Sequence, residues 1–242
     1  SVASRPLSEA RQLALRARDL SLDKYNSTAD DFAAAEGLLR RALELDSNDS
    51  EILAVASQFN TSIRTRGFDH SPARRETARS QAERALKLAP DSLEALFALG
   101  RIQRDGDPDP AVAERTFRAV LARDPQHGGA LSNLGTIYTR TGREEEAIAM
   151  FERCGRQPRW RPLARYQEYL LHFGRGKFDE AERCLRESIA AEPSSNAVTG
   201  LAMVLLTARG DARAAVEALR QMPAASRQEH RAVRSEERRV GK

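Results

Sequence analysis

Small and apolar residues recur along this chain at a fixed interval of 34 residues. Glycines stand at this spacing at Gly142, Gly176 and Gly210. Five residues after each glycine comes an alanine, and four residues later a bulky apolar residue: Ala147 with Phe151, Ala181 with Leu185, and Ala215 with Leu219. Positions three, four and seven apart share one face of an α-helix. The pattern therefore predicts a repeated helix that buries a small residue against a neighbouring helix.

The same pattern extends toward the N-terminus and predicts a second, preceding helix in each repeat. Alanines continue the series at Ala113, Ala78 and Ala35, at successive intervals of 34, 35 and 43 residues. The preceding helices carry their own small residue, because Leu96, Leu99, Gly100 and Gln103 recur 35 residues later as Leu131, Leu134, Gly135 and Tyr138. Second helices are followed by prolines, which cannot continue a helix, at Pro90, Pro125, Pro158 and Pro193.

The sequence thus predicts six pairs of helices. Their expected bounds are 7–22 with 30–45, 50–66 with 72–88, 92–105 with 110–123, 128–140 with 143–155, 161–174 with 177–190, and 196–208 with 211–222. They make an all-α domain over residues 1–223, with repeats at 7–45, 50–90, 92–125, 128–158, 161–193 and 196–223. A further helix is expected at 224–233, as a cap or the opening of another repeat. Because one pair cannot bury its apolar face alone, the repeats are expected to stack.

This repeat resembles that of the tetratricopeptide repeat family. The fourth repeat carries the clearest copy of the family pattern: Leu131, Leu134, Gly135, Tyr138, Gly142, Ala147, Phe151 and Pro158, the proline coming one residue early. The resemblance covers residues 7–223. It implies a right-handed α-solenoid whose first helices line a concave groove, which holds an extended peptide or a helix of a partner.

Two departures from the family pattern lead to further predictions. The loops at 21–30 and 67–71 are longer than usual, so the helix pairs of repeats one and two are expected to splay. In the fifth repeat, Glu168 and Tyr169 stand where Leu and Gly are expected. A better apolar stripe is made by Leu163, Tyr166, Leu170 and Phe173. We therefore expect the first helix of this repeat to be rotated or shifted by about one residue.

Composition favours the same fold and excludes other classes. Aromatic residues are only 5% of the chain, which argues against a β-sandwich or a parallel-sheet enzyme. A mean hydropathy of -0.58, with no apolar run near ~20 residues, argues against a membrane-spanning segment. The 39 basic and 35 acidic side chains leave a net charge of only +4, so the arginines are largely balanced. Two cysteines without paired spacing do not indicate a disulfide scaffold.

The sequence contains no recognisable catalytic or metal-binding motif. The four histidines lie in separate repeats without ligand spacing, and no cysteine pair joins them. The three consecutive acids that begin at Glu144 open a helix, where negative charge interacts favourably with the helix dipole. Cys154 and Cys184 are expected to be buried small residues rather than reactive thiols. We therefore expect a protein that is not an enzyme and that has no cofactor and no metal.

The expected function is that of a protein-interaction scaffold, which binds another protein or a peptide in its groove. The groove candidates lie on first helices, beside the packed face: Gln58, Thr61, Phe97, Arg101, Arg104, Ser132, Asn133, Thr136, Thr139 and Arg140. Arg101, Arg104 and Arg140 are expected to be exposed. Because arginine binds carboxylates in a bidentate manner, an acidic peptide or a free C-terminus is the expected ligand. The alternative is that these arginines are solvated and bind nothing.

Other interpretations concern the partner and the parent protein. Helical repeats of similar length also bind RNA, although acids at helical spacing balance the arginines and make nucleic acid the less favoured partner. Repeats one and two resemble those of bacterial multidomain signalling proteins. That resemblance implies an attached effector domain. Separately, we expect a cytoplasmic location, with the periplasmic part of a membrane-anchored parent as the alternative. Residues 234–242 resemble a translated sequencing adapter and are interpreted as a non-native tail.

Overall fold

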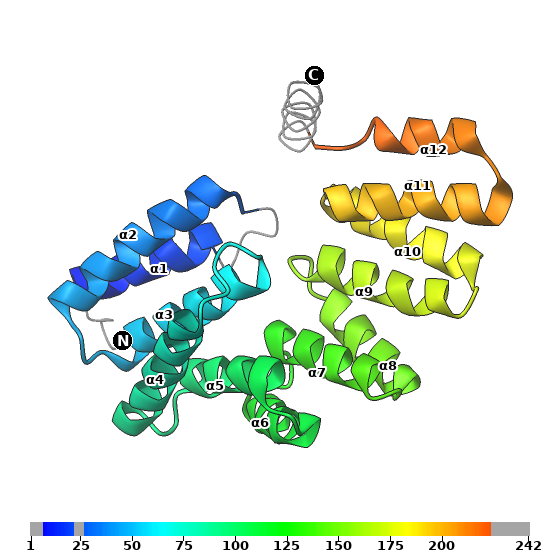
Figure 1. The fold of residues 1–242 in the computed structure, drawn as a ribbon. Helices are drawn as coiled ribbons and strands as arrows, with labels where there is room; N and C mark the ends of the chain where they lie inside the picture. The colour runs from blue at the N-terminus through cyan, green and yellow to red at the C-terminus, as the bar shows by residue number, and fades with distance from the viewer. Residues whose placement is uncertain (1–6, 22–26, 224–242) are drawn as a thin grey trace, which may run out of the picture. The chain divides into compact units, whose positions relative to one another are not determined.

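The computed structural model describes residues 7–21 and 27–223, and these residues form twelve α-helices and no strand (Figure 1). The helices are α1 (Glu9–Ser21), α2 (Ala29–Leu45), α3 (Ser50–Thr65), α4 (Pro72–Leu88), α5 (Leu93–Gly106), α6 (Pro110–Arg123), α7 (Gly128–Arg140), α8 (Glu144–Gly155), α9 (Arg161–Gly174), α10 (Phe178–Ala191), α11 (Ser195–Arg209) and α12 (Ala212–Leu219). The largest departure from the predicted bounds is at α12, which ends at Leu219 rather than at residue 222. The predicted all-α class is confirmed. The helix expected at 224–233 and the tail at 234–242 lie outside the described residues.

The chain divides into two compact units, residues 1–137 and 138–242. In the first unit α1 packs on α2, α3 on α4 and α5 on α6, and α3 also contacts α1 and α5. In the second unit α9 packs on α8 and α10, and α11 packs on α10 and α12. Within each unit, consecutive helices therefore pack as stacked repeats do. None of the described helices combines the length and the apolarity that a bilayer-spanning helix needs.

The recurring glycines lie in the turns between the two helices of a repeat. Gly142, Gly176 and Gly210 have positive φ angles of 75°, 70° and 62°. This left-handed conformation is unfavourable for residues that carry a Cβ atom, so the turn favours glycine. The 34-residue spacing of the sequence is thus a repeated backbone turn in the structure.

The recurring alanines lie in tightly packed positions. They are fully buried together with the apolar residue four positions later: Ala113 with Phe117, Ala147 with Phe151, and Ala181 with Leu185. In the last repeat Ala215 is buried, but Leu219 is 39% exposed. A Cβ atom added at Gly100 would lie 2.8 Å from the ring of Phe117. Glycine at this position therefore lets α5 approach α6 closely.

The prediction that the helix pairs of repeats one and two splay is wrong. Ala14 of α1 and Phe32 of α2 belong to one buried core. The Ser57 hydroxyl of α3 donates to the main-chain oxygen of Ala78 in α4 over 2.8 Å. Small residues on the facing surfaces bring both pairs together. The longer loops do not prevent this, because loop-closure entropy rises only slowly with loop length.

The predicted shift of the first helix of the fifth repeat is also wrong. The buried residues of α9 are Pro162, Ala164, Glu168, Tyr169 and Leu171. Leu170, part of the expected apolar stripe, is 44% exposed, whereas Glu168 is 3% exposed. The carboxylate of Glu168 accepts a hydrogen bond from Arg165 over 2.5 Å, and Arg165 also pairs with Glu187 over 2.8 Å. Because its charge is paired, Glu168 occupies the leucine position and the unshifted register is kept.

We expect the stability contributed by Glu168 to fall as the pH rises. Burial raises the pKa of Glu168 above its ordinary value, although the charge of Arg165 opposes this rise. The folded state therefore binds this proton more tightly than the unfolded state does. The stabilisation is complete below the unfolded pKa of Glu168 and is lost as the pH rises through the folded pKa.

Melting curves of the native chain and of Glu168→Gln, recorded from about pH 4 to about pH 8, test this expectation. The Tm of the native chain relative to that of the variant should decrease with rising pH, because the glutamine does not titrate. A Tm difference that stays constant over this range would contradict the expectation.

Candidate functional site

The structure brings several predicted groove residues together on the first helices of the first unit. Arg101 of α5 donates from Nη2 to the Ser62 hydroxyl over 2.9 Å and from Nη1 to the main-chain oxygen of Gln58 over 3.3 Å. Both partners lie on α3. Arg104 of α5 donates to the side-chain oxygen of Asn133 in α7. We call this set the first-helix face: Gln58, Ser62, Arg101, Arg104 and Asn133.

The prediction that Arg101 and Arg104 are exposed is wrong. Both are half-buried, and the Arg104 side chain is 18% exposed. Five other candidates are buried: Gln58, Thr61, Phe97, Ser132 and Asn133. Thr136 is half-buried, while Thr139 and Arg140 are exposed. The difference arises because neighbouring first helices bind one another through these polar side chains, which the periodicity of one helix does not reveal.

Phe97 is a core residue of the first unit. It is 7% exposed, and its ring centroid lies 5.9 Å from that of Phe117 and 4.6 Å from that of His127. A Cβ atom added at Gly129 would lie 2.6 Å from the Phe97 ring. Phe97 therefore fixes the packing of α5 against α6 and the start of α7, and it offers little surface to a partner.

Arg101 is a cation held among neutral hydrogen-bond acceptors. Burial lowers the pKa of Arg101 to about 10, and the positive charges of Arg104 and Arg66 act in the same direction while Asp105 opposes them. The guanidinium therefore remains charged at neutral pH. Within the described part of the chain its hydrogen-bond partners are a hydroxyl and a main-chain oxygen, and it forms no ion pair. The first-helix face thus holds a charge that a carboxylate of a ligand would neutralise.

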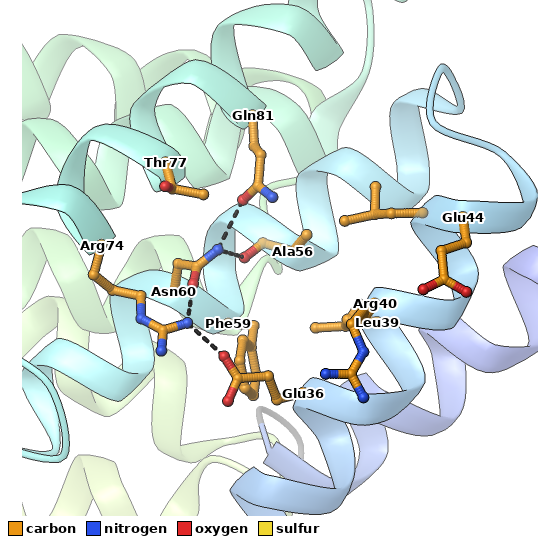
Figure 2. Close-up of a pocket in the computed structure, with 11 residues that line it drawn as sticks. Glu36, Leu39, Arg40, Glu44, Ala56, Phe59, Asn60, Arg74, Thr77 and Gln81 are labelled. Atoms are coloured by element: carbon orange, nitrogen blue, oxygen red, sulfur yellow. Dashed lines mark hydrogen bonds and ion pairs between the residues drawn. The ribbon is translucent and has the colours of Figure 1, made fainter.

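A cavity of about 390 Å³ lies between α2, α3 and α4 (Figure 2). Its apolar lining comes from α2 and α3: Leu39, Leu43, Ala56 and Phe59. Figure 2 shows Glu36 and Arg40 on α2, and Thr77 and Gln81 on α4. Sequence analysis missed this cavity, because no local pattern encodes the spacing of helices from two repeats.

A chain of hydrogen bonds links the three helices that line the cavity. Arg74 of α4 binds Glu36 over 2.7 Å and the side-chain oxygen of Asn60 over 2.9 Å. Asn60 in turn donates to the side-chain oxygen of Gln81 over 2.9 Å. Arg74 also binds Asp69 over 3.0 Å. These groups satisfy one another across three helices and hold the side chains in place, as Figure 2 shows.

The two cysteines are core residues, as predicted. Cys154 and Cys184 are both buried. Burial raises the pKa of Cys184 to about 12, so its thiol stays protonated at neutral pH and is a poor nucleophile. Across residues 7–21 and 27–223, no group of three His, Cys, Asp or Glu side chains is placed to hold a metal ion.

The paired helices, the repeated turn and the first-helix face define a helical repeat protein.

Comparison with known proteins identifies the kind of repeat. The tetratricopeptide repeat family model matches residues 108–158 and 166–230. Over 76 residues the chain is 43% identical to cellulose synthase operon protein C of Xanthomonas axonopodis pv. citri (strain 306). That match covers 31% of the chain and 5% of the relative, so the chain spans only a small part of the relative's length.

Solved structures share the fold over most of the chain. A thermophilic tetratricopeptide repeat protein of Thermus thermophilus gives a TM-score of 0.64 at 17% identity, covering 82% of this chain and 100% of that one. The type IV pilus biogenesis factor PilW gives 0.62 at 19% identity, covering 88% and 91%. Pseudomonas aeruginosa pilF gives 0.58 at 16% identity, covering 93% and 99%.

Residues 108–158 and 166–230 belong to the tetratricopeptide repeat family, as the resemblance predicted. Repeats of this family serve in general as protein-interaction scaffolds and not as enzymes. The RNA-binding alternative gains no support from these matches.

Proposed function

We propose that the chain binds an acidic segment of a partner protein on its first-helix face. The observation that carries this proposal is the state of Arg101, a half-buried cation whose hydrogen bonds go to neutral oxygens. Placing a charge in a partly desolvated site is costly unless an opposite charge neutralises it. A carboxylate bound to Arg101 would supply that charge.

The unused hydrogen-bond donors and the positive charge around Arg101 suit a carboxylate group of a ligand. Its guanidinium has five N–H donors. Two of them are used in the hydrogen bonds to Gln58 and Ser62. The remaining donors point to no acceptor in the described structure. Arg104 adds a second positive charge nearby, although Asp105 pairs with it over 2.7 Å. Charge-assisted, bidentate hydrogen bonds are the strongest that such a pair of arginines offers.

The two arginines indicate that the ligand is acidic, but they do not indicate its length. Thr139 and Arg140, exposed at the end of α7, stay predicted contact residues. The bacterial parent, its signalling role, an attached effector domain and the cytoplasmic or periplasmic location also stay predictions. The match to a cellulose synthase operon protein adds a role in cellulose synthesis as a competing hypothesis. The complete reading frame of the gene would show whether an effector domain is attached.

Replacing Arg101 with glutamine is expected to weaken the binding of a fluorescein-labelled hexaglutamate peptide by about tenfold or more. A charge-assisted hydrogen bond contributes about 1.5–3 kcal/mol, and the amide keeps the polarity of the site while removing the charge. Fluorescence anisotropy measures the dissociation constant, and circular dichroism checks the fold. Arg104→Gln should have a smaller effect, because Asp105 already neutralises part of its charge.

Matched controls are available on second helices. Arg118 and Arg186 are exposed and lie on α6 and α10, so their glutamine variants should bind hexaglutamate like the native chain. Equal losses at Arg101 and at both controls would mean that the peptide senses diffuse surface charge. A labelled oligouridylate that binds more tightly than hexaglutamate would favour the RNA alternative instead.

A further inference from the structure

We propose that the cavity between α2, α3 and α4 is a second peptide-binding site, which accepts a large apolar side chain followed by a carboxylate. This site does not depend on the first-helix face, because it is built from α2 and α4 and from the opposite side of α3. Its proposed ligand is a short extended segment of a partner protein. The lining, the charge and the length of the cavity all favour such a ligand.

The floor of the cavity is apolar and belongs to the fixed core. Leu39, Ala56 and Phe59 are 4%, 2% and 2% exposed, and all three belong to the core shared by α1, α2 and α3. The volume of about 390 Å³ falls within the range of about 300–1,000 Å³ that is usual for ligand pockets. An apolar side chain that enters the cavity would move from water into contact with these apolar side chains, which the core already holds in place.

The charge at the rim of the cavity favours an acidic neighbour for that side chain. Glu36 pairs with Arg74, which also binds Asp69, and Glu44 pairs with Arg41 over 3.2 Å. Arg40 lines the same cavity and is exposed, yet it forms no ion pair within the described ranges. Its guanidinium is therefore available to a ligand, whereas Arg74 already binds two carboxylates. A carboxylate next to the anchoring side chain would bind Arg40.

A hydrogen-bond donor faces Arg40 from the opposite wall. The side-chain oxygen of Gln81 already accepts from Asn60, while the Gln81 amide nitrogen has no partner in the described structure. This nitrogen can donate to a main-chain oxygen of a bound segment. Both walls of the cavity thus present donors, and a peptide supplies acceptors at regular intervals.

The shape of the lining favours an extended segment over a compact ligand. On α2 the lining runs from Glu36 to Glu44, and on α4 from Arg74 to Gln81. At 1.5 Å per helical residue, each wall is about 10–12 Å long. An extended chain advances about 3.3 Å per residue, so the cavity spans three to four residues of a ligand. An apolar residue and a following acid fit within this length.

The test measures binding of three fluorescein-labelled nonapeptides to the full chain by fluorescence anisotropy. They share a Gly/Ser frame and differ in their central pair, which is Phe-Glu, Ser-Glu or Phe-Lys. We expect the Phe-Glu peptide to bind at least tenfold more tightly than the other two. Thr77→Phe, an exposed change on the cavity wall, should weaken its binding at least tenfold by filling the mouth. Arg40→Gln should cause a similar loss for this peptide only.

Each variant has a matched control. Ser80 is exposed on the same helix but does not line the cavity, so Ser80→Phe should bind like the native chain. Arg115 is an exposed arginine on α6, and Arg115→Gln should be equally silent. Circular dichroism confirms that all four variants fold.

Three outcomes would overturn the proposal. The first is equal binding of the three peptides, or no binding of the Phe-Glu peptide. The second is an equal loss in Ser80→Phe and Thr77→Phe. The third is loss of Phe-Glu binding in Arg101→Gln but not in Thr77→Phe, which would assign the peptide to the first-helix face. Failure of hexaglutamate binding at Arg101 would leave the cavity result unchanged, so the two proposals fail separately.

Discussion

Replacing Arg165 with alanine is expected to destabilise the second unit by about 3 kcal/mol. Arg165 is the cation that pairs with Glu168, whose side chain is only 4% exposed. Removing one partner of a buried ion pair leaves an uncompensated charge, which costs about 3–5 kcal/mol. We expect the lower end of this range, because Glu168 can take up a proton when its partner is absent. Denaturant unfolding followed by circular dichroism measures the change.

Replacing Glu168, the other member of the ion pair, is not expected to destabilise the second unit. Glu168→Leu places the apolar residue of the fourth repeat in the same position, and replacing a buried charge by a packed apolar group is often neutral or stabilising. The control is Arg183→Ala, because Arg183 is 64% exposed and pairs with Glu187 at 3.8 Å. It should change the unfolding free energy by less than ~0.5 kcal/mol. If Arg165→Ala were equally mild, Glu168 would not depend on its ion pair.

Replacing Ala181 or Ala147 with leucine is expected to destabilise the chain by about 1–3 kcal/mol. Both alanines are fully buried on the packed faces of second helices. The extra carbon atoms have no space and must displace neighbouring side chains or the helices themselves. Thermal and denaturant unfolding curves report the loss.

Ala149 provides the comparison for these two positions. It lies on α8, two residues after Ala147, and it is exposed. Ala149→Leu should therefore have little effect, since the added side chain meets solvent. Equal losses at Ala147, Ala149 and Ala181 would show that the 34-residue pattern does not mark a packing position.

The helices and their pairing could be predicted from the sequence because both depend on local features. Gly176 is required by a turn with positive φ, and Ala181 by a close approach of two helices. The turn recurs in the last three repeats, and the buried alanine in the third repeat as well, so both leave a periodic trace. The same holds for Cys154, which was expected to be a buried small residue on a second helix.

The site residues could be predicted only in part, because their environment depends on contacts between repeats. The sequence placed Arg101 on the first-helix face, but its burial follows from Gln58 and Ser62, which lie 43 and 39 residues away. Glu168 was missed as a core residue for a similar reason. The repeat pattern predicts an apolar residue at this position, and a carboxylate is compatible with burial there only because Arg165 neutralises it. The cavity beside Arg40 required the positions of three helices.

The three turn glycines also have a consequence for chirality. A Cβ atom added at Gly142, Gly176 or Gly210 would meet nothing within 4 Å. The turn therefore has room for a methyl group, and only the backbone handedness of L-amino acids excludes alanine. A D-alanine, in contrast, adopts positive φ without backbone strain. What the repeat selects at this position is the mirror symmetry of the residue and not its size.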